Sequence, residues 1–239
     1  MHDGDPAGIH HLPGAGSLAP PSSLETALPN ASCDLILTNP PFGSDLTDTE
    51  ALKHFEVGRG RPSRRRGVLF LERCIQLLRP GGRLAIVLDD SVLNLPSNKD
   101  IRCHVLATCL VEAVISLPDV AFMPYSTAKS SVLIIKKRMH DNEKQGTVFM
   151  ADVEHVGNRP NGDPLFSEEY DESGNRTLLS DLPLVLDAYR EYAASGAAES
   201  SRNGTMMFSA DIGESATEEA RLDVYYFHPA RRVAEKLLQ

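Results

Sequence analysis

Short apolar runs alternate with amphipathic stretches between residues 33 and 138, and this alternation restricts the folds open to the chain. CDLILT at Cys33–Thr38 and RLAIVL at Arg83–Leu88 have the length and composition of buried strands. Between them, Val68–Leu78 has apolar residues on one helical face and polar residues on the other, and Pro80-Gly81-Gly82 follows as a stop signal. This order predicts a largely parallel sheet covered by helices, with functional loops at the carboxyl ends of its strands.

The next segments extend the same pattern. Lys99–Thr108 is helix-like, and Val111–Leu117 and Ser130–Lys136 are strand-like. A loop of about 12 residues without helical periodicity joins these two strands, which favours an antiparallel pair over a crossover. The predicted fold is therefore α/β, a partial Rossmann-like sheet whose last two strands are antiparallel.

Composition divides the chain into three predicted parts. Residues 1–32 are rich in Gly, Pro, Ala, Ser and His and have no sustained period, which indicates irregular structure. Residues 33–150 hold the alternating elements. Residues 151–239 are polar over long stretches, with helices expected at Leu182–Ala193 and Ala230–Gln239, and we expect a partly disordered accessory tail there.

The charges are unevenly distributed. The net charge is -9, yet residues 1–150 carry 16 basic and 16 acidic residues, and the remainder carries 8 and 17. The acidic tail therefore holds all of the excess, and the net charge does not exclude nucleic acid as a partner of the first part. A cluster of five arginines in GRGRPSRRRG, which includes Arg64, Arg65 and Arg66, suits a DNA backbone, with a solvated loop as the alternative.

Several classes of protein are disfavoured. The four cysteines form no CxxC pair, so no metal site is predicted. No apolar run approaches the roughly 20 residues that span a bilayer, and the first residues lack the pattern of a secretory signal. The sequence predicts a cytoplasmic protein without a membrane partner.

The tetrapeptide Asn39-Pro40-Pro41-Phe42 directly follows the first predicted strand. A strand-ending turn is one explanation, because Asn and Pro are common turn formers. The other is chemical: the Asn39 amide and the Pro40 carbonyl are two acceptors on one stiff turn, and Phe42 offers a ring for stacking. Two acceptors beside an aromatic face describe a site for the exocyclic amine of a nucleobase.

Three consecutive segments resemble adenine-N6 DNA methyltransferases, most nearly the modification subunits of type I restriction–modification systems. These segments are DLILTNPPFG, LFLERCIQLLRPGGRLAIVL and IRCHVLATCLVEAVISLPDVAFMPYSTAKSSVLIIKK. The resemblance implies transfer of a methyl group from S-adenosylmethionine to the N6 amino group of adenine in DNA. It also implies specificity and restriction subunits as partners.

The resemblance assigns roles to individual residues. Asn39 and the Pro40 carbonyl would accept the two amino hydrogens, while Pro41 stiffens the turn and Phe42 stacks on an extruded base. Phe122 would support the opposite face of that base, with a core phenylalanine as the alternative. Lys129 would contact phosphate, with a solvated lysine as the alternative.

The pattern of the family is incomplete in this sequence. Its glycine-rich cofactor loop after a first strand, and the acidic residue after a second strand, have no counterpart here, so cofactor-binding residues stay unassigned. We therefore expect residues 33–150 to be the catalytic half of an N-terminally truncated methyltransferase domain. Loss of the neighbouring strand would leave Leu35 and Leu37 on an uncovered edge.

Two other functions stay open. One is a non-catalytic DNA-binding or assembly subunit that uses the arginine cluster and the tail. The other is methylation of a protein amide or an RNA amine, against which Phe42 counts mildly, because tyrosine is more usual at that place in those enzymes.

Overall fold

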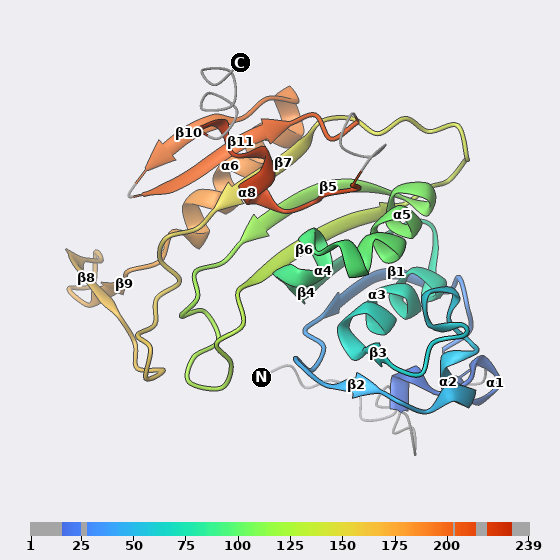
Figure 1. Cartoon of the computed structure of the whole chain (residues 1–239). Coiled ribbons are helices and arrows are strands. Elements are labelled where there is room, and N and C mark those ends of the chain that lie inside the picture. The colour runs from blue at the N-terminus through green and yellow to red at the C-terminus, as the bar shows by residue number, and fades with distance from the viewer. Residues whose placement is uncertain (1–15, 25–27, 203, 214–218, 231–239) are drawn as a thin grey trace.

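The computed structural model describes residues 16–24, 28–202, 204–213 and 219–230. Seven strands form one sheet with the order β1-β4-β6-β5-β7-β11-β10 (Figure 1). The bounds of these strands are β1 Cys33–Thr38, β4 Leu78–Asp89, β5 Cys109–Ser116, β6 Ser130–Lys137, β7 Val148–Asp152, β10 Glu199–Arg202 and β11 Thr205–Ala210.

The sheet is mixed. β1 is parallel to β4, with Leu37 opposite Ala85, and β5 is parallel to β7. β6 lies between β4 and β5 and is antiparallel to both. The predicted α/β class and the antiparallel pairing of the two strands around residues 109–137 are confirmed.

Helices cover both faces of the sheet, but unevenly. α3 (Arg66–Leu77), α4 (Asp90–Asn94) and α5 (Lys99–Thr108) lie on one face, and α6 (Leu182–Ser195) lies on the other face at the β7–β11 end (Figure 1). The short elements are η2 Gly16–Leu18, α1 Pro21–Leu24, β2 Asp45–Leu46, α2 Thr49–Leu52, η3 Glu56–Gly58, β3 Arg64–Arg65, η4 Pro96–Asn98, β8 Phe166–Tyr170, β9 Arg176–Leu178 and α8 Val224–Phe227.

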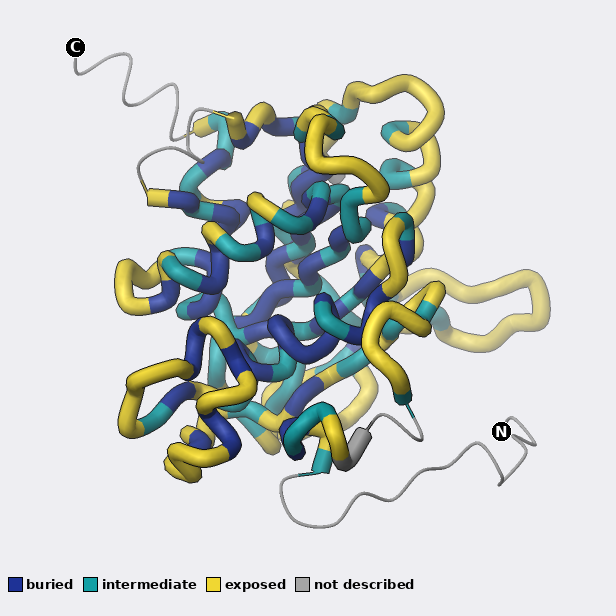
Figure 2. The backbone as a smooth tube through the Cα atoms, turned by 90° about the vertical axis from the view of Figure 1, so that its right-hand side faces the viewer, coloured by how far each residue is buried: buried dark blue, intermediate teal, exposed yellow. Residues whose placement is uncertain are grey.

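Two apolar cores result from this layering. The larger one packs α3, α4 and α5 against alternate residues of β4, where Leu84, Ile86 and Leu88 are buried. The smaller one lies under α6 and includes Phe149 and Met207. The buried backbone runs through the middle of the molecule and the exposed backbone forms its outer loops (Figure 2).

The Pro80-Gly81-Gly82 stop signal lies inside a strand. α3 ends at Leu77, and β4 begins at the next residue and continues through these three residues. The pairing with β1 shifts there, from Cys33 opposite Leu78 to Leu35 opposite Arg83. Gly82 fits because a Cβ atom on it would lie 2.8 Å from the Cys33 carbonyl oxygen. The signal therefore ends the helix, as predicted, without ending regular structure.

The main sheet continues past residue 150, where the accessory tail was expected to begin. That boundary falls within β7, and β11 pairs antiparallel with β7 over residues 206–210. Met207, Phe208 and Ala210 are buried, so this stretch of the expected polar tail belongs to the core. The helix predicted at Leu182–Ala193 is α6, whereas the one predicted at Ala230–Gln239 lies almost wholly outside the described residues.

β1 is an edge strand within the described part of the chain, since its one partner there is β4. Leu35 is 59% exposed and Leu37 is 71% exposed, in agreement with the predicted uncovered edge. Across residues 16–24, 28–202, 204–213 and 219–230, no helix has the length and apolar character needed to cross a bilayer.

Candidate active site

The Asn39–Phe42 turn opens into a cleft of about 1140 Å³ at the carboxyl end of β1. Asp89, the last residue of the parallel strand β4, lines the same cleft. Residues 121–128 form a second wall, and Asn158 with residues 161–163 forms a third. The cleft is large enough for a nucleoside-sized ligand.

The residues of the turn differ in exposure. Asn39 is exposed, Pro40 is buried and Phe42 is half-buried. Among the residues that the structure describes, no protein donor reaches the Asn39 amide oxygen or the Pro40 carbonyl. Acceptors of this kind are available to a ligand with an amino group.

Phe122 lies against Phe42. Their ring centroids are 5.2 Å apart and the ring planes are tilted by 54°. Phe122 comes from the loop between β5 and β6, so the fold brings together the two aromatic residues that were predicted to hold one base. Phe122 is half-buried, and it packs in part against the smaller core.

Asp89 is a cleft residue that the sequence analysis missed. One of its carboxylate oxygens accepts from the Ser91 N–H at 2.9 Å and caps α4, and the other accepts from Arg65 at 3.2 Å. The signal for it was available: the Asp89-Asp90 pair directly follows a buried strand.

Asp90 is held differently from its neighbour. Ser131 donates to its carboxylate at 2.6 Å, and burial raises the pKa of Asp90, while the nearby charge of Lys129 acts in the opposite direction. Lys129 itself lies outside the lining of the cleft, and its carbonyl accepts from the Asp90 N–H at 3.0 Å.

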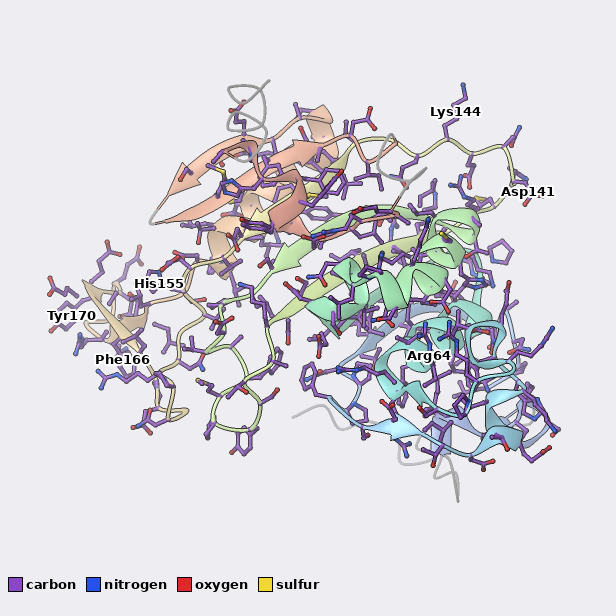
Figure 3. All side chains as sticks on the ribbon, viewed as in Figure 1. Arg64, Asp141, Lys144, His155, Phe166 and Tyr170 are labelled. Atoms are coloured by element: carbon purple, nitrogen blue, oxygen red, sulfur yellow. The ribbon has the colours of Figure 1, made fainter. Side chains whose placement is uncertain are left out.

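The three predicted arginines have separate environments. Arg64 is 6% exposed, donates to Asp100 at 2.5 Å and to the Ser97 carbonyl at 3.2 Å, and burial lowers its pKa. Figure 3 labels Arg64 beside the helices drawn in cyan. Arg64 therefore lies inside the protein. The expectation that it follows a DNA backbone is wrong, because its guanidinium already donates to Asp100 and to the Ser97 carbonyl.

Arg65 and Arg66 lie at the surface beside the turn. Both share a small cleft with residues 40–44, and the Arg66 N–H donates to the Ser44 carbonyl at 3.0 Å. The Arg65 guanidinium donates from this cleft to the Asp89 carboxylate. A basic pair next to the aromatic residues suits a phosphate flanking a bound base.

The third wall of the cleft was also unforeseen. Asn158 donates from its side-chain nitrogen to the Val120 carbonyl at 2.8 Å, which ties this wall to the Phe122 loop. The Asn-Gly-Asp turn at residues 161–163 was visible in the sequence as a turn signal. Its place beside Asn39 depends on β7 and could not be read from the signal alone.

The mixed sheet, the polar turn after β1 and the aromatic loop beside it place the chain among α/β proteins with a ligand cleft at the carboxyl end of a parallel strand. The profile of the N-6 DNA methylase family matches residues 3–174. This match covers more than half of the chain, and the chain belongs to that family.

Individual relatives agree with the family assignment. The chain is 33% identical over 127 residues to the type I restriction enzyme StySPI methylase subunit of Salmonella potsdam, a match that covers 53% of this chain and 22% of that protein. It is 32% identical over 120 residues to the EcoKI methylase subunit of Escherichia coli strain K12, covering 50% and 22%. The match thus spans about a fifth of the length of these relatives.

A solved structure has the same fold. The type I restriction–modification system methyltransferase subunit from Streptococcus thermophilus superposes with a TM-score of 0.54 at 20% identity. The superposition covers 82% of this chain and 38% of that protein.

Proposed function

We propose that this chain binds adenine of DNA and positions its N6 amino group for methylation by S-adenosylmethionine, as part of a restriction–modification system. The observation that carries the proposal is the pair of acceptors on Asn39 and Pro40, free of protein donors among the described residues and next to the Phe42–Phe122 pair. Membership of the N-6 DNA methylase family supports it.

The geometry gives the turn a defined chemical task. The Asn39 amide oxygen and the Pro40 carbonyl accept one amino hydrogen each, which draws the nitrogen lone pair out of conjugation with the ring. S-adenosylmethionine supplies an electrophilic methyl group. The two oxygens would stabilise the positive charge that develops on N6 as the methyl–sulfur bond breaks and S-adenosylhomocysteine leaves, and one N6 proton would then pass to water. Phe42 holds the ring plane, because an extruded base needs a stacking partner.

We propose that the described residues supply the base side of this site and that the cofactor side lies outside them. The described part of the chain holds no glycine-rich turn after a strand preceding β1, and the Gly14–Gly16 stretch lies largely outside it. We propose that a further polypeptide segment carries the cofactor loop and covers β1, where Leu35 and Leu37 are exposed.

The DNA side has candidate contacts. We propose that Arg65 and Arg66, beside the turn, contact the phosphates that flank the flipped adenine, and that Lys129 has a weaker role because it lies outside the cleft. Specificity and restriction subunits are proposed as partners, since the relatives are named as methylase subunits of type I restriction enzymes.

Methyl transfer tests the proposal. Purified chain, alone and with the proteins that copurify with it from its own host, is incubated with radiolabelled S-adenosylmethionine and unmethylated DNA, and N6-methyladenine is counted. We expect the copurified assembly to transfer labelled methyl groups to adenine in the DNA. The Asn39→Ala variant should lose this transfer. The Asn142→Ala variant, with a change in an exposed loop, should retain it. DNA association without any transfer, unchanged by Asn39→Ala, supports the non-catalytic DNA-binding or assembly subunit instead. Transfer to a protein amide or an RNA amine also contradicts the proposal.

Calorimetry tests the cofactor side separately. We expect the isolated chain to give no heat of tight binding with S-adenosylmethionine, and the copurified assembly to bind it. Tight binding by the isolated chain refutes the proposal that a further segment carries the cofactor loop.

A further inference from the structure

The loop that carries Phe122 is tied to a turn from beyond β7. The Asn158 side chain donates to the Val120 carbonyl at 2.8 Å, and the Met123 N–H donates to the same carbonyl at 3.1 Å. The hydrogen bond from Asn158 thus ends on a backbone group two residues before Phe122. Asn158 also lines the cleft that holds the Asn39–Phe42 turn.

The turn that follows Asn158 is ordered by its own hydrogen bonds. The Arg159 N–H donates to the Asp163 carbonyl at 2.8 Å, and the Gly162 N–H donates to the Arg159 carbonyl at 2.9 Å. Gly162 has φ +88°, and a Cβ atom on it would lie 3.0 Å from Cδ of Pro124. The turn therefore packs closely on the far side of Phe122, two residues after it.

The Phe122 loop is thus held on both sides of its aromatic residue, and the ring contacts Phe42. A base between two parallel rings separates them by two carbon–carbon contact distances, roughly 7 Å. The observed centroid separation is 5.2 Å and the ring planes are tilted by 54°, so the rings must move apart by about 2 Å and turn towards parallel when a base enters. A loop that yields by this amount and still presses on the base needs an anchor outside the ring contact.

We propose that Asn158 is a positioning residue that anchors the Phe122 loop, so that Phe122 closes on the second face of the bound adenine. This inference rests on the proposed function. Asn158 acts through Val120 and touches no reacting atom. The close packing of Gly162 on Pro124 is the second anchor.

A single introduced tryptophan reports on the Phe122 loop by its fluorescence. The chain has no tryptophan, so Phe122→Trp introduces a unique fluorophore into the loop. Asn158→Asp keeps the size of the side chain and removes its N–H donor, while Asn158→Ala removes the donor without adding charge. Asn142→Asp adds the same charge in the loop that holds Asp141 and Lys144, at the opposite end of the molecule from the β8–β9 hairpin (Figure 3).

Two readouts are measured in the Phe122→Trp background: acrylamide quenching of the free protein, and the spectral change on titration with deoxyadenosine, a neutral probe. We expect both Asn158 variants to make the introduced indole more accessible to acrylamide and to weaken deoxyadenosine binding by about three- to tenfold, the effect of one lost hydrogen bond. Asn142→Asp should change neither readout. Gly162→Ala should shift both in the same direction as the Asn158 variants, because the added methyl displaces Pro124.

The outcomes separate the two proposals. If the indole fluorescence responds to deoxyadenosine and the Asn158 variants match Asn142→Asp in both readouts, the anchoring role is wrong and the base site stands. If the Phe122→Trp protein without further changes gives no response to deoxyadenosine, the base site is wrong and the inference is overturned with it. Circular dichroism confirms that each variant is folded, and an unfolded Asn158→Asp is replaced by Asn158→Ala.

Discussion

Phe42 and Phe122 come from opposite ends of the predicted α/β region, yet their ring centroids lie 5.2 Å apart. One ring follows β1 and the other lies in the loop that joins β5 and β6. Because β4 and β6 bring these two loops to the same edge of the sheet, the aromatic pair is a product of strand order. Phe42 lies in the wall of the cleft that contains Asn39, and Phe122 lies in the wall formed by residues 121–128.

Removal of the second ring should weaken base binding more than stability. We expect Phe122→Ala to lower the affinity for adenine-containing DNA by about tenfold, since stacking of a base on an aromatic ring contributes roughly 1–3 kcal/mol. Equilibrium binding by anisotropy measures the loss. Tyr170→Ala, at an exposed tyrosine of the hairpin, is the matched aromatic control and should bind as the parent does.

Substitution of Arg64 should mainly lower stability, whereas substitution of Arg65 should mainly affect DNA binding. Arg64→Ala removes one of the two arginine partners of Asp100, which is partly exposed and keeps its ion pair with Arg61, so we expect a loss of about 1–2 kcal/mol in the free energy of unfolding, measured with urea. Arg65 is exposed and its ion pair with Asp89 contributes at most about 1 kcal/mol. Arg65→Ala should instead reduce the salt dependence of DNA binding by about one ion. A stable Arg64→Ala protein contradicts the structural role of that residue.

Asp90 predicts a pH dependence of stability. Burial raises its pKa in the folded protein above the ordinary value, so the folded state binds more protons than the unfolded state between the two pKa values. The free energy of unfolding contributed by this group therefore falls as the pH rises from the ordinary carboxyl pKa through the raised one. Asp90→Asn keeps an acceptor for Ser131 and should remove this fall. Urea titrations of both proteins at several pH values between about 4 and 7 test the sign, since the two curves should converge at the acid end.

The four thiols should differ in reactivity. Burial raises the pKa of Cys74 to about 12 and also raises the pKa of Cys109, whereas Cys103 is exposed. We expect iodoacetamide at pH 8 to label Cys103 first and to leave Cys74 and Cys109 unmodified until the protein unfolds. Mass spectrometry of peptides from short reactions gives the order. Early labelling of Cys74 would mean that α3 is not packed as described.

The uncovered strand should be an aggregation site. Leu37→Lys places a charge on the exposed edge strand β1, and we expect less light scattering at high protein concentration with an unchanged melting temperature. Leu84→Lys, in the buried face of β4, is the contrasting variant and should unfold the protein. Equal light scattering by the parent protein and the Leu37→Lys variant would show that aggregation does not occur through the edge strand β1.

The local elements could be predicted from the order of the residues alone. The predicted helix at Lys99–Thr108 has the bounds of α5, and the strand at Cys33–Thr38 has the bounds of β1. These two predictions are confirmed because apolar periodicity and flanking Pro, Gly and polar residues are signals that depend only on residues close in the chain. The acceptor pair of Asn39 and Pro40 is likewise a property of adjacent residues.

Which side chains line the cleft depends on the pairing of strands that are distant in the chain. Arg64 is in the same arginine cluster as Arg65, but it turns inward to Asp100 while Arg65 reaches Asp89. Asn158, in a stretch that was predicted to be an accessory tail, reaches the Phe122 loop because β7 pairs with β5. Periodicity and turn signals describe contacts between residues close in the chain, whereas ion-pair partners and cleft walls depend on strand pairing between distant segments, which one sequence does not encode in any local pattern.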